Sequence, residues 1–362
     1  MDVTNKKDLN DDDLLSVGLS KPAIRRFRDE IKRKKNEYRV KDSKQPKLLS
    51  LFAGKGEGRP LSADGHCVVS GRSSHYGASN SMKPGVPTSP SSSSLTCLIQ
   101  RNEIKIFEKL GEGYFATVHC GTWTRPSGKK VVVAVKQNIH DTNVLSDELI
   151  QEVNNMSQLS HRNLVKLYGV VIRPVMLVVE LCEGGELLTR LRSTNKPVVL
   201  MSSLWHWSMQ ILSGMICLES AGLIHRDLAA RNVFLTKDGR TAKIGDFGLT
   251  RCLPNPEEYY IMSNRKRIPV KWSAPESLKK RQWSHKSDVW MFGITLWEMF
   301  SYGVEPWPNY ENSDILGVIE AGEQNMKPRN CPNSIYRLMV QCWSLDPSGR
   351  PSFKELRNRL GQ

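Results

Sequence analysis

Two short motifs in the second half of the sequence constrain its fold and chemistry more than any other feature. The first, His-Arg-Asp-Leu-Ala-Ala-Arg-Asn, occupies residues 225–232, and the second, Asp-Phe-Gly, occupies residues 246–248. They supply a carboxylate at Asp227 that can orient an attacking hydroxyl group, and hard oxygen ligands at Asn232 and Asp246 of the kind that Mg²⁺ prefers. Phosphoryl transfer needs metal ligands, positive charge and correct positioning, so the two motifs indicate that chemistry.

The order and spelling of these motifs resemble the catalytic loop and metal-binding turn of eukaryotic protein kinases. The resemblance implies an α+β fold with two lobes, a small β-rich N-lobe at about residues 99–181 and a larger helical C-lobe at about 182–362. It implies ATP as the phosphoryl donor, together with Mg²⁺ or Mn²⁺. It also makes Asp227 the catalytic base, and Asn232 and Asp246 the metal ligands.

A glycine-rich segment upstream predicts where the nucleotide phosphates bind. Residues 111–118 read Gly-Glu-Gly-Tyr-Phe-Ala-Thr-Val, a hairpin whose backbone N–H groups can approach ATP closely. Ala116 replaces the third glycine of the kinase pattern, which makes the loop stiffer at its far end. The apolar strand at 131–136 ends in Lys136, which the resemblance places on the α- and β-phosphates, and Glu152 is the helix glutamate that would hold this lysine.

Residues 176–185 read as a strand followed by an extended link. By resemblance Val179 is the gatekeeper, and Glu180 to Cys182 form the hinge, whose backbone groups would pair with adenine. Phe234 stands where kinases commonly have a leucine, and its larger ring would tighten the pocket floor. The resemblance assigns nucleotide contacts to Gly111, Glu112, Gly113, Tyr114, Phe115, Ala116, Val118, Ala134, Lys136, Val179, Glu180, Cys182 and Phe234.

Two segments favour tyrosine as the acceptor over serine or threonine. Serine/threonine kinases usually carry a lysine two residues after the catalytic aspartate, whereas this chain has Ala229 there and Arg231 later, as tyrosine kinases do. The stretch Pro-Val-Lys-Trp at 269–272 agrees, because a tyrosine ring needs an apolar platform farther from the base. We therefore predict a tyrosine kinase in which Arg231 belongs to the catalytic set.

The segment after the metal turn carries a candidate switch. By resemblance Tyr260, beside Tyr259, is the position of autophosphorylation. A phosphate there brings a charge of roughly −1.5 to −2, and Arg226 and Arg251 are its candidate partners.

Three further residues have predicted structural roles. Asp288, in a stretch that resembles the buried central helix of the C-lobe, would brace the backbone of the catalytic loop. Arg350 resembles the arginine that pairs with Glu276 at the end of the activation segment.

The first part of the chain differs in composition from the rest. Within residues 1–40, a Leu-Leu pair, a Gly-Leu turn and a basic amphipathic helix resemble the last part of a sterile alpha motif (SAM) domain. A solvated basic helix is the alternative. Residues 41–98 are rich in Ser, Gly and Pro and cannot bury enough apolar surface to offset the ordering cost, which predicts a disordered linker. Residues 99–362 form the kinase domain.

A formal net charge of +15, much of it between residues 21 and 47, is compatible with an anionic membrane surface or with nucleic acid as a partner. Nucleic acid is disfavoured, because no zinc-finger or RNA-recognition spacing occurs. No apolar run approaches the length of a bilayer span, and the first residues lack the apolar core of a signal peptide. We expect a soluble cytoplasmic protein that associates peripherally with membranes or vesicles.

The sequence around the motifs resembles that of the Ack family of non-receptor tyrosine kinases over residues 95–362. The segments that carry this resemblance include 95–99, 161–164, 252–254 and 290–293. The resemblance implies protein substrates that contain tyrosine. Family members associate with an activated Rho-type GTPase through segments that follow the kinase domain. Because this sequence stops at Gln362, links to a GTPase or an adaptor would run through regions absent from it.

Three other classes remain as alternatives. A pseudokinase scaffold would share the fold, although such proteins usually lose the strand lysine, the base or the metal ligands, all of which are present here. A lipid or small-molecule kinase is disfavoured by the peptide-platform segment at 269–272. The basic N-terminal region leaves open an adaptor or membrane-associating protein that carries a kinase.

Overall fold

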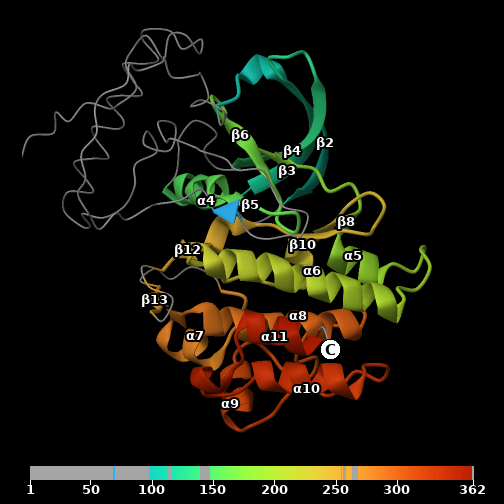
Figure 1. Cartoon of the computed structure of the whole chain (residues 1–362), viewed down its shortest axis with the longest axis vertical. Helices are drawn as coiled ribbons and strands as arrows, with labels where there is room; N and C mark the ends of the chain where they lie inside the picture. Colours follow the sequence, from blue (N-terminus) through green and yellow to red (C-terminus); the bar gives the residue numbers. More distant parts are fainter. Residues whose placement is uncertain are drawn as a thin grey trace, which may run out of the picture. The chain divides into compact units, whose positions relative to one another are not determined.

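The computed structural model describes residues 68–69, 98–112, 116–138, 147–253, 255, 258–262 and 268–360. These residues divide into two compact units, one built on a five-stranded sheet and the other mainly helical (Figure 1). The predicted α+β class, with a β-rich N-lobe and a helical C-lobe, is confirmed. The SAM-like fragment, nearly all of the predicted linker, and the glycine-loop residues 113–115 lie outside the described residues.

The sheet unit arises from runs of β-branched residues separated by turns. Its strand order is β2-β3-β4-β7-β6, with β2 paired antiparallel to β3, β3 to β4, and β6 to β7. Three consecutive valines at 131–133 explain why β4 forms, because branched side chains pack well on a pleated surface. The strands are β2 (Ile104–Glu112), β3 (Ala116–Thr124), β4 (Lys130–Asn138), β6 (Leu167–Ile172) and β7 (Val175–Glu180).

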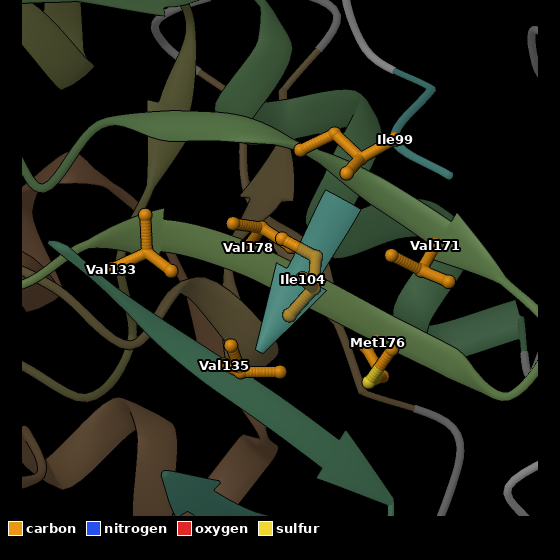
Figure 2. Close-up of a cluster of buried hydrophobic side chains, with 7 residues drawn as sticks. All are labelled: Ile99, Ile104, Val133, Val135, Val171, Met176 and Val178. Atoms are coloured by element: carbon orange, nitrogen blue, oxygen red, sulfur yellow. The ribbon is translucent and has the colours of Figure 1, made fainter. Parts of the chain in front are cut away.

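The main buried cluster of this unit packs on one face of β4. Val133 and Val135 join the buried cluster in Figure 2, whose other members are Ile99, Ile104, Val171, Met176 and Val178. Each such side chain contributes roughly 1.5–3 kcal/mol when fully buried. Because successive side chains on a strand point to opposite faces, Ala134 and Lys136 project from the other face of β4.

The second unit consists of helices joined by short strands and 3₁₀ turns. Its helices are α4 (Asp147–Ser157), α5 (Leu187–Arg192), α6 (Met201–Ser220), α7 (Pro275–Lys280), α8 (His285–Phe300), α9 (Ile315–Glu320), α10 (Asn333–Cys342) and α11 (Phe353–Leu360). The remaining short strands are β1 (Val68–Val69), β5 (Leu159–Ser160), β8 (Gly185–Glu186), β9 (Leu223–Ile224), β10 (Val233–Leu235), β11 (Ala242–Ile244), β12 (Arg251–Cys252), β13 (Tyr260–Ile261) and β14 (Gln282–Trp283). Within the described part of the chain, helices fall short of the length and apolarity needed to cross a membrane.

Helix α8 is the centre of the helical unit, and Figure 1 shows it between α6 and α10. Fifteen of its sixteen residues are buried, in keeping with a mainly apolar sequence from Val289 onward. Ser284 caps its start by accepting a hydrogen bond from the Ser287 N–H. At Gly293 an added Cβ would lie 2.7 Å from Cys342 Cβ, so glycine permits the close approach of α10.

A hairpin brings the two sequence motifs together. The catalytic loop, residues 225–232, follows β9 and leads into β10, and the metal turn at 245–248 follows β11. Strands β10 and β11 pair antiparallel with Val233 opposite Ile244. The end of the loop and the start of the turn therefore lie at the same end of this hairpin.

Candidate active site

The backbone of the catalytic loop is held by a buried carboxylate on α8. The His225 N–H donates to Asp288 Oδ2 at 2.7 Å, and the Arg226 N–H donates to Asp288 Oδ1 at 2.9 Å. Arg226 has φ of 70°, in the left-handed region that non-glycine residues occupy only under constraint. Burial raises the pKa of Asp288 to about 6, and the two backbone donors oppose that shift. The predicted bracing role of Asp288 is confirmed.

His225 connects the loop to the metal turn as a neutral imidazole. Its Nδ1 lies 3.2 Å from the Asp227 N–H, which donates to it, and its Nε2 lies 3.1 Å from Gly245 O. These partners place the ring proton on Nε2, which then donates to the carbonyl. Burial lowers the pKa of His225 and keeps the ring neutral. A T-shaped contact with Phe247, at 5.6 Å between ring centroids, fixes its orientation further.

Asp227 is oriented by two partners from its own loop. Arg231 Nη2 forms an ion pair with Asp227 Oδ1, and Asn232 Nδ2 donates to Asp227 O at 2.7 Å. Burial raises the pKa of the Asp227 carboxyl, while the Arg231 guanidinium acts in the opposite direction. The Asp227 side chain keeps 17% of its surface exposed, so this carboxylate can still reach a substrate.

Asn232 and Asp246 offer oxygens suited to a divalent cation. The Gly245 N–H donates to Asn232 O at 2.9 Å, which ties the metal turn to the end of the catalytic loop. Since the amide nitrogen of Asn232 is engaged by Asp227 O, its side-chain oxygen is the atom left to face a cation. Asp246 is exposed and has φ of 57°. These hard oxygen donors fit the expected metal.

The predicted phosphate-binding strands occupy the sheet unit. Val118 on β3 pairs directly with Lys136 on β4, so both side chains share the face opposite the buried cluster. Ala134 lies two residues before Lys136 and projects the same way. Gly111 pairs with Val118, and Glu112 with Thr117, across β2 and β3. The structure thus gathers the described members of this predicted set on one hairpin and its neighbouring strand.

Glu152 lies on α4 in the helical unit and is buried. The same helix is anchored next to the metal turn, because Asn155 Nδ2 donates to Thr250 O at 2.9 Å. Lys136 belongs to the other unit, and its pairing with Glu152 stays a prediction.

Glu180, in the predicted hinge, is held by neighbouring segments. The Glu180 N–H donates to Lys166 O at 2.8 Å, and the Glu180 carboxylate lies 3.1 Å from Lys243 Nζ. Burial raises the pKa of the Cys182 thiol to about 12, so this thiol is neutral and a poor nucleophile.

Phe234 packs against Gly245, where an added Cβ would lie 2.9 Å from the ring. Its bulk therefore presses on the turn that precedes Asp246.

Comparison with known sequences identifies the family of this fold and site. The profile described as protein tyrosine and serine/threonine kinase matches residues 104–360. The chain belongs to that family. Its predicted resemblance to protein kinases is confirmed, and so is the narrower resemblance to the Ack group, through the relatives that match it.

These relatives are named tyrosine kinases or Ack kinases. Activated Cdc42 kinase Ack of Drosophila melanogaster is 42% identical over 356 residues, which is 96% of this chain and 31% of that protein. Tyrosine-protein kinase sid-3 of Caenorhabditis elegans is 45% identical over 263 residues, 73% of this chain and 21% of that protein. Human non-receptor tyrosine-protein kinase TNK1 is 36% identical over 355 residues, 96% of this chain and 50% of that protein. The chain therefore spans between about a fifth and a half of their lengths.

The end of the kinase activation segment is fixed by a buried ion pair. Arg350 donates to both oxygens of Glu276, at 2.7 and 2.8 Å, and the Arg350 side chain is fully buried. This bidentate pair was predicted from the sequence and is confirmed.

Tyr260 lies against the two arginines predicted to meet its phosphate. The guanidinium carbon of Arg226 is 4.8 Å from the centroid of the Tyr260 ring, and that of Arg251 is 5.9 Å away. Trp283 on β14 pairs with Tyr260 on β13 and also stacks on Arg226 at 4.9 Å. Sequence reasoning missed Trp283, because no motif spacing connects it to the loop.

Two further residues of the kinase site escaped the sequence analysis as functional positions. Glu298 on α8 accepts hydrogen bonds from the Ala230 N–H and from Trp272 Nε1. The ring of Trp272 in turn lies under the guanidinium of Arg231, at 4.5 Å. The sequence signal was a glutamate in the apolar second half of a buried helix, because a buried carboxylate needs hydrogen-bond donors.

Proposed function

We propose that this chain is an ATP-dependent protein tyrosine kinase that transfers the γ-phosphoryl group of ATP to tyrosines of protein substrates. The observation that carries the proposal is the Asp227 carboxylate, which is partly exposed and paired with Arg231. Membership of the kinase family and the names of the relatives support it.

The proposed reaction uses Asp227 as the base. The phenolic oxygen of the substrate bonds to the γ-phosphorus while the bond from that phosphorus to the leaving oxygen of ADP breaks. The phenolic proton passes to an oxygen of Asp227. Arg231, paired with Asp227, favours its ionised form and orients it.

The proposed nucleotide contacts follow from the position of each residue. Lys136 would bind the α- and β-phosphates, with Glu152 as its ion-pair partner in the active state. Because the Glu180 N–H already donates to Lys166 O, the adenine contacts we propose use the Glu180 carbonyl and the backbone of Cys182. The remaining proposed contacts are those of Gly111, Glu112, Gly113, Tyr114, Phe115, Ala116, Val118, Ala134, Val179 and Phe234.

The divalent cation that we propose is Mg²⁺, with Mn²⁺ as the alternative. Asn232 and Asp246 would hold it through their side-chain oxygens. When bound, the cation neutralises charge on the phosphates. The arrangement that supports this assignment is the hydrogen bond from the Gly245 N–H to Asn232 O, together with the engaged amide nitrogen of Asn232.

Asp227→Asn should abolish phosphotransfer while leaving ATP binding intact, because an amide cannot accept the phenolic proton. Lys136→Met should lower the rate by about 10² or more through lost electrostatic stabilisation. Asp238→Asn, in the exposed turn between β10 and β11, is the matched control and should keep its activity. The purified chain would be incubated with ATP, Mg²⁺ and mixed peptides, and the phosphorylated side chains identified by mass spectrometry. Dominant phosphoserine, or near-normal turnover in Asp227→Asn, contradicts the proposal.

The partners and location of the protein are also proposals. The Drosophila relative is named for activated Cdc42, which supports a proposed link to a Rho-type GTPase or an adaptor. We propose a cytoplasmic protein whose basic region at 21–47 meets an anionic membrane surface. The domain division into a SAM-like fragment at 1–40, a linker at 41–98 and a kinase domain at 99–362 is proposed on the same sequence grounds.

A further inference from the structure

A buried carboxylate joins two segments that lie far apart in the sequence. Glu298, only 1% exposed on α8, presents one oxygen, Oε2, to two donors. The Ala230 N–H of the catalytic loop lies 3.0 Å from this oxygen, and Trp272 Nε1 of the peptide platform lies 2.7 Å from it. Burying an ionised carboxylate costs free energy unless hydrogen-bond donors satisfy it, so losing either of these hydrogen bonds would destabilise the arrangement.

The ring of Trp272 acts on the next residue of the loop. The Arg231 guanidinium carbon lies 4.5 Å from the centroid of that ring, within the range of a cation–π contact. Arg231 keeps about a third of its side chain exposed, and a long exposed side chain normally samples many rotamers. Stacking on the indole restricts this freedom and leaves Nη2 on Asp227 Oδ1.

We propose that Glu298 and Trp272 are positioning residues that hold Arg231 against the catalytic base. The contacts run from Glu298 to Trp272, from Trp272 to Arg231, and from Arg231 to Asp227. The same Glu298 oxygen also fixes the loop backbone at Ala230, one residue before Arg231. The platform and the catalytic loop therefore keep a common alignment. This inference rests on the proposed kinase function and names the residues that orient its base.

A double-mutant cycle on kcat tests whether Trp272 acts through Arg231. Trp272→Leu removes both the ring face and the N–H donor, and should lower kcat for a tyrosine peptide about tenfold to a hundredfold. KM for ATP should change by less than about threefold, because Trp272 is not among the proposed nucleotide contacts. In the Arg231→Ala background the same change should cost less than about twofold. Losses that multiply independently would mean a general structural role and overturn the proposal.

Two conservative variants separate the contacts. Trp272→Phe keeps a ring under Arg231 but loses the donor to Glu298, so its kcat should lie between those of the parent and Trp272→Leu. Glu298→Gln keeps one acceptor oxygen for the same donors and should lose less activity than Glu298→Leu. If Trp272→Phe is as impaired as Trp272→Leu, the stacking contact contributes nothing and the proposal fails.

Amide hydrogen exchange gives a measurement that does not depend on activity. Exchange across residues 226–231 should accelerate in Trp272→Leu and Glu298→Leu, while β11 keeps its protection. Unchanged exchange in the loop would overturn the positioning role even in an active enzyme. If these variants exchange faster but the parent chain transfers no phosphate to tyrosine, the positioning role stands and the proposed function is contradicted instead.

Discussion

At the scale of single residues, burial raises the pKa of three carboxyl groups around the catalytic loop, yet they differ in exposure and in their hydrogen-bond donors. Asp288 is fully buried and Glu298 is 1% exposed, and both accept backbone N–H groups. The Asp227 side chain is 17% exposed and its partner is a side chain, Arg231. Exposure and the kind of donor therefore favour Asp227 as the proposed base and leave the other two as supports of the loop.

His285 makes a prediction about pH and stability. It is buried at the start of α8, neither ring nitrogen has a partner there, and burial lowers its pKa to about 4. The unfolded chain binds this proton near pH 6.5, so the free energy of unfolding should fall as pH drops from 6.5 towards 4 and then stop falling. The expected loss is about 3 kcal/mol.

Denaturant unfolding of His285→Leu and of the parent across this pH range measures the effect as a difference. The difference matters because the parent also contains Asp288, whose pKa is raised to about 6. Its contribution to the free energy of unfolding falls as pH rises from about 4 to 6, which is opposite to the effect of His285. His206→Leu on the exposed side of α6 is the matched control. Parallel curves for the parent and His285→Leu would refute this role of His285.

At the scale of elements, two glycines in different helices should respond oppositely to alanine. In Gly293→Ala the new Cβ would lie 2.7 Å from Cys342 Cβ and from Trp343 Nε1, which pushes α10 away from α8. Overpacking of this kind costs about 1–3 kcal/mol and outweighs the gain in helix propensity.

Gly317 in α9 is the matched control, since nothing lies within 4 Å of an added Cβ there. Gly317→Ala should therefore stabilise the protein by about 0.5–1 kcal/mol. Thermal or denaturant unfolding of both variants decides the matter. A stabilised Gly293→Ala would show that the contact between α8 and α10 is not tight.

The activation segment yields a prediction about switching. Tyr260 lies over Arg226 and Arg251, whereas Tyr259 is 53% exposed. A phosphate on Tyr260 would meet both arginines and tie the segment to the catalytic loop. Tyr260→Phe should therefore lower activity moderately and more than Tyr259→Phe, and Arg251→Ala should remove the benefit of phosphorylation. Autophosphorylation mapped by mass spectrometry, with kinetics of the three variants, checks this. Phosphate on Tyr259 with Tyr260 unmodified would contradict it.

At the scale of the whole molecule, charge is concentrated away from the catalytic motifs. Residues 21–47 hold 12 Lys and Arg against four Asp and Glu, a formal charge of +8 out of the total of +15. A basic cluster gains roughly 1 kcal/mol per Lys or Arg at an anionic surface. The chain without residues 1–48 should therefore lose binding to vesicles that contain phosphatidylserine, while its peptide phosphorylation stays within about twofold of the parent. Co-sedimentation and peptide kinetics measure the two properties separately, with phosphatidylcholine vesicles as the control. Undiminished vesicle binding by the shortened chain would place the membrane contact elsewhere.

The motifs were enough to predict the fold class, the Asp288 brace and the pair of Glu276 with Arg350, and the roles of the catalytic loop and the metal turn stay predictions. Each lies in a short stretch whose residue types and spacing are demanded by phosphoryl transfer or by a buried charge that needs its partner. The pairing of Lys136 with Glu152 stays a prediction, as do the individual nucleotide contacts.

What the sequence by itself determined is therefore the family and the chemistry that we propose, because catalytic groups must come as particular residue types at particular separations. Only the tertiary structure decided how those groups are supported. Glu298 and Trp272 are 26 residues apart and meet at one carboxylate oxygen, and Trp283 reaches Arg226 of the catalytic loop from strand β14. Such contacts leave no local pattern, since an indole or a buried carboxylate can be satisfied by any donor or cation that folding brings within reach.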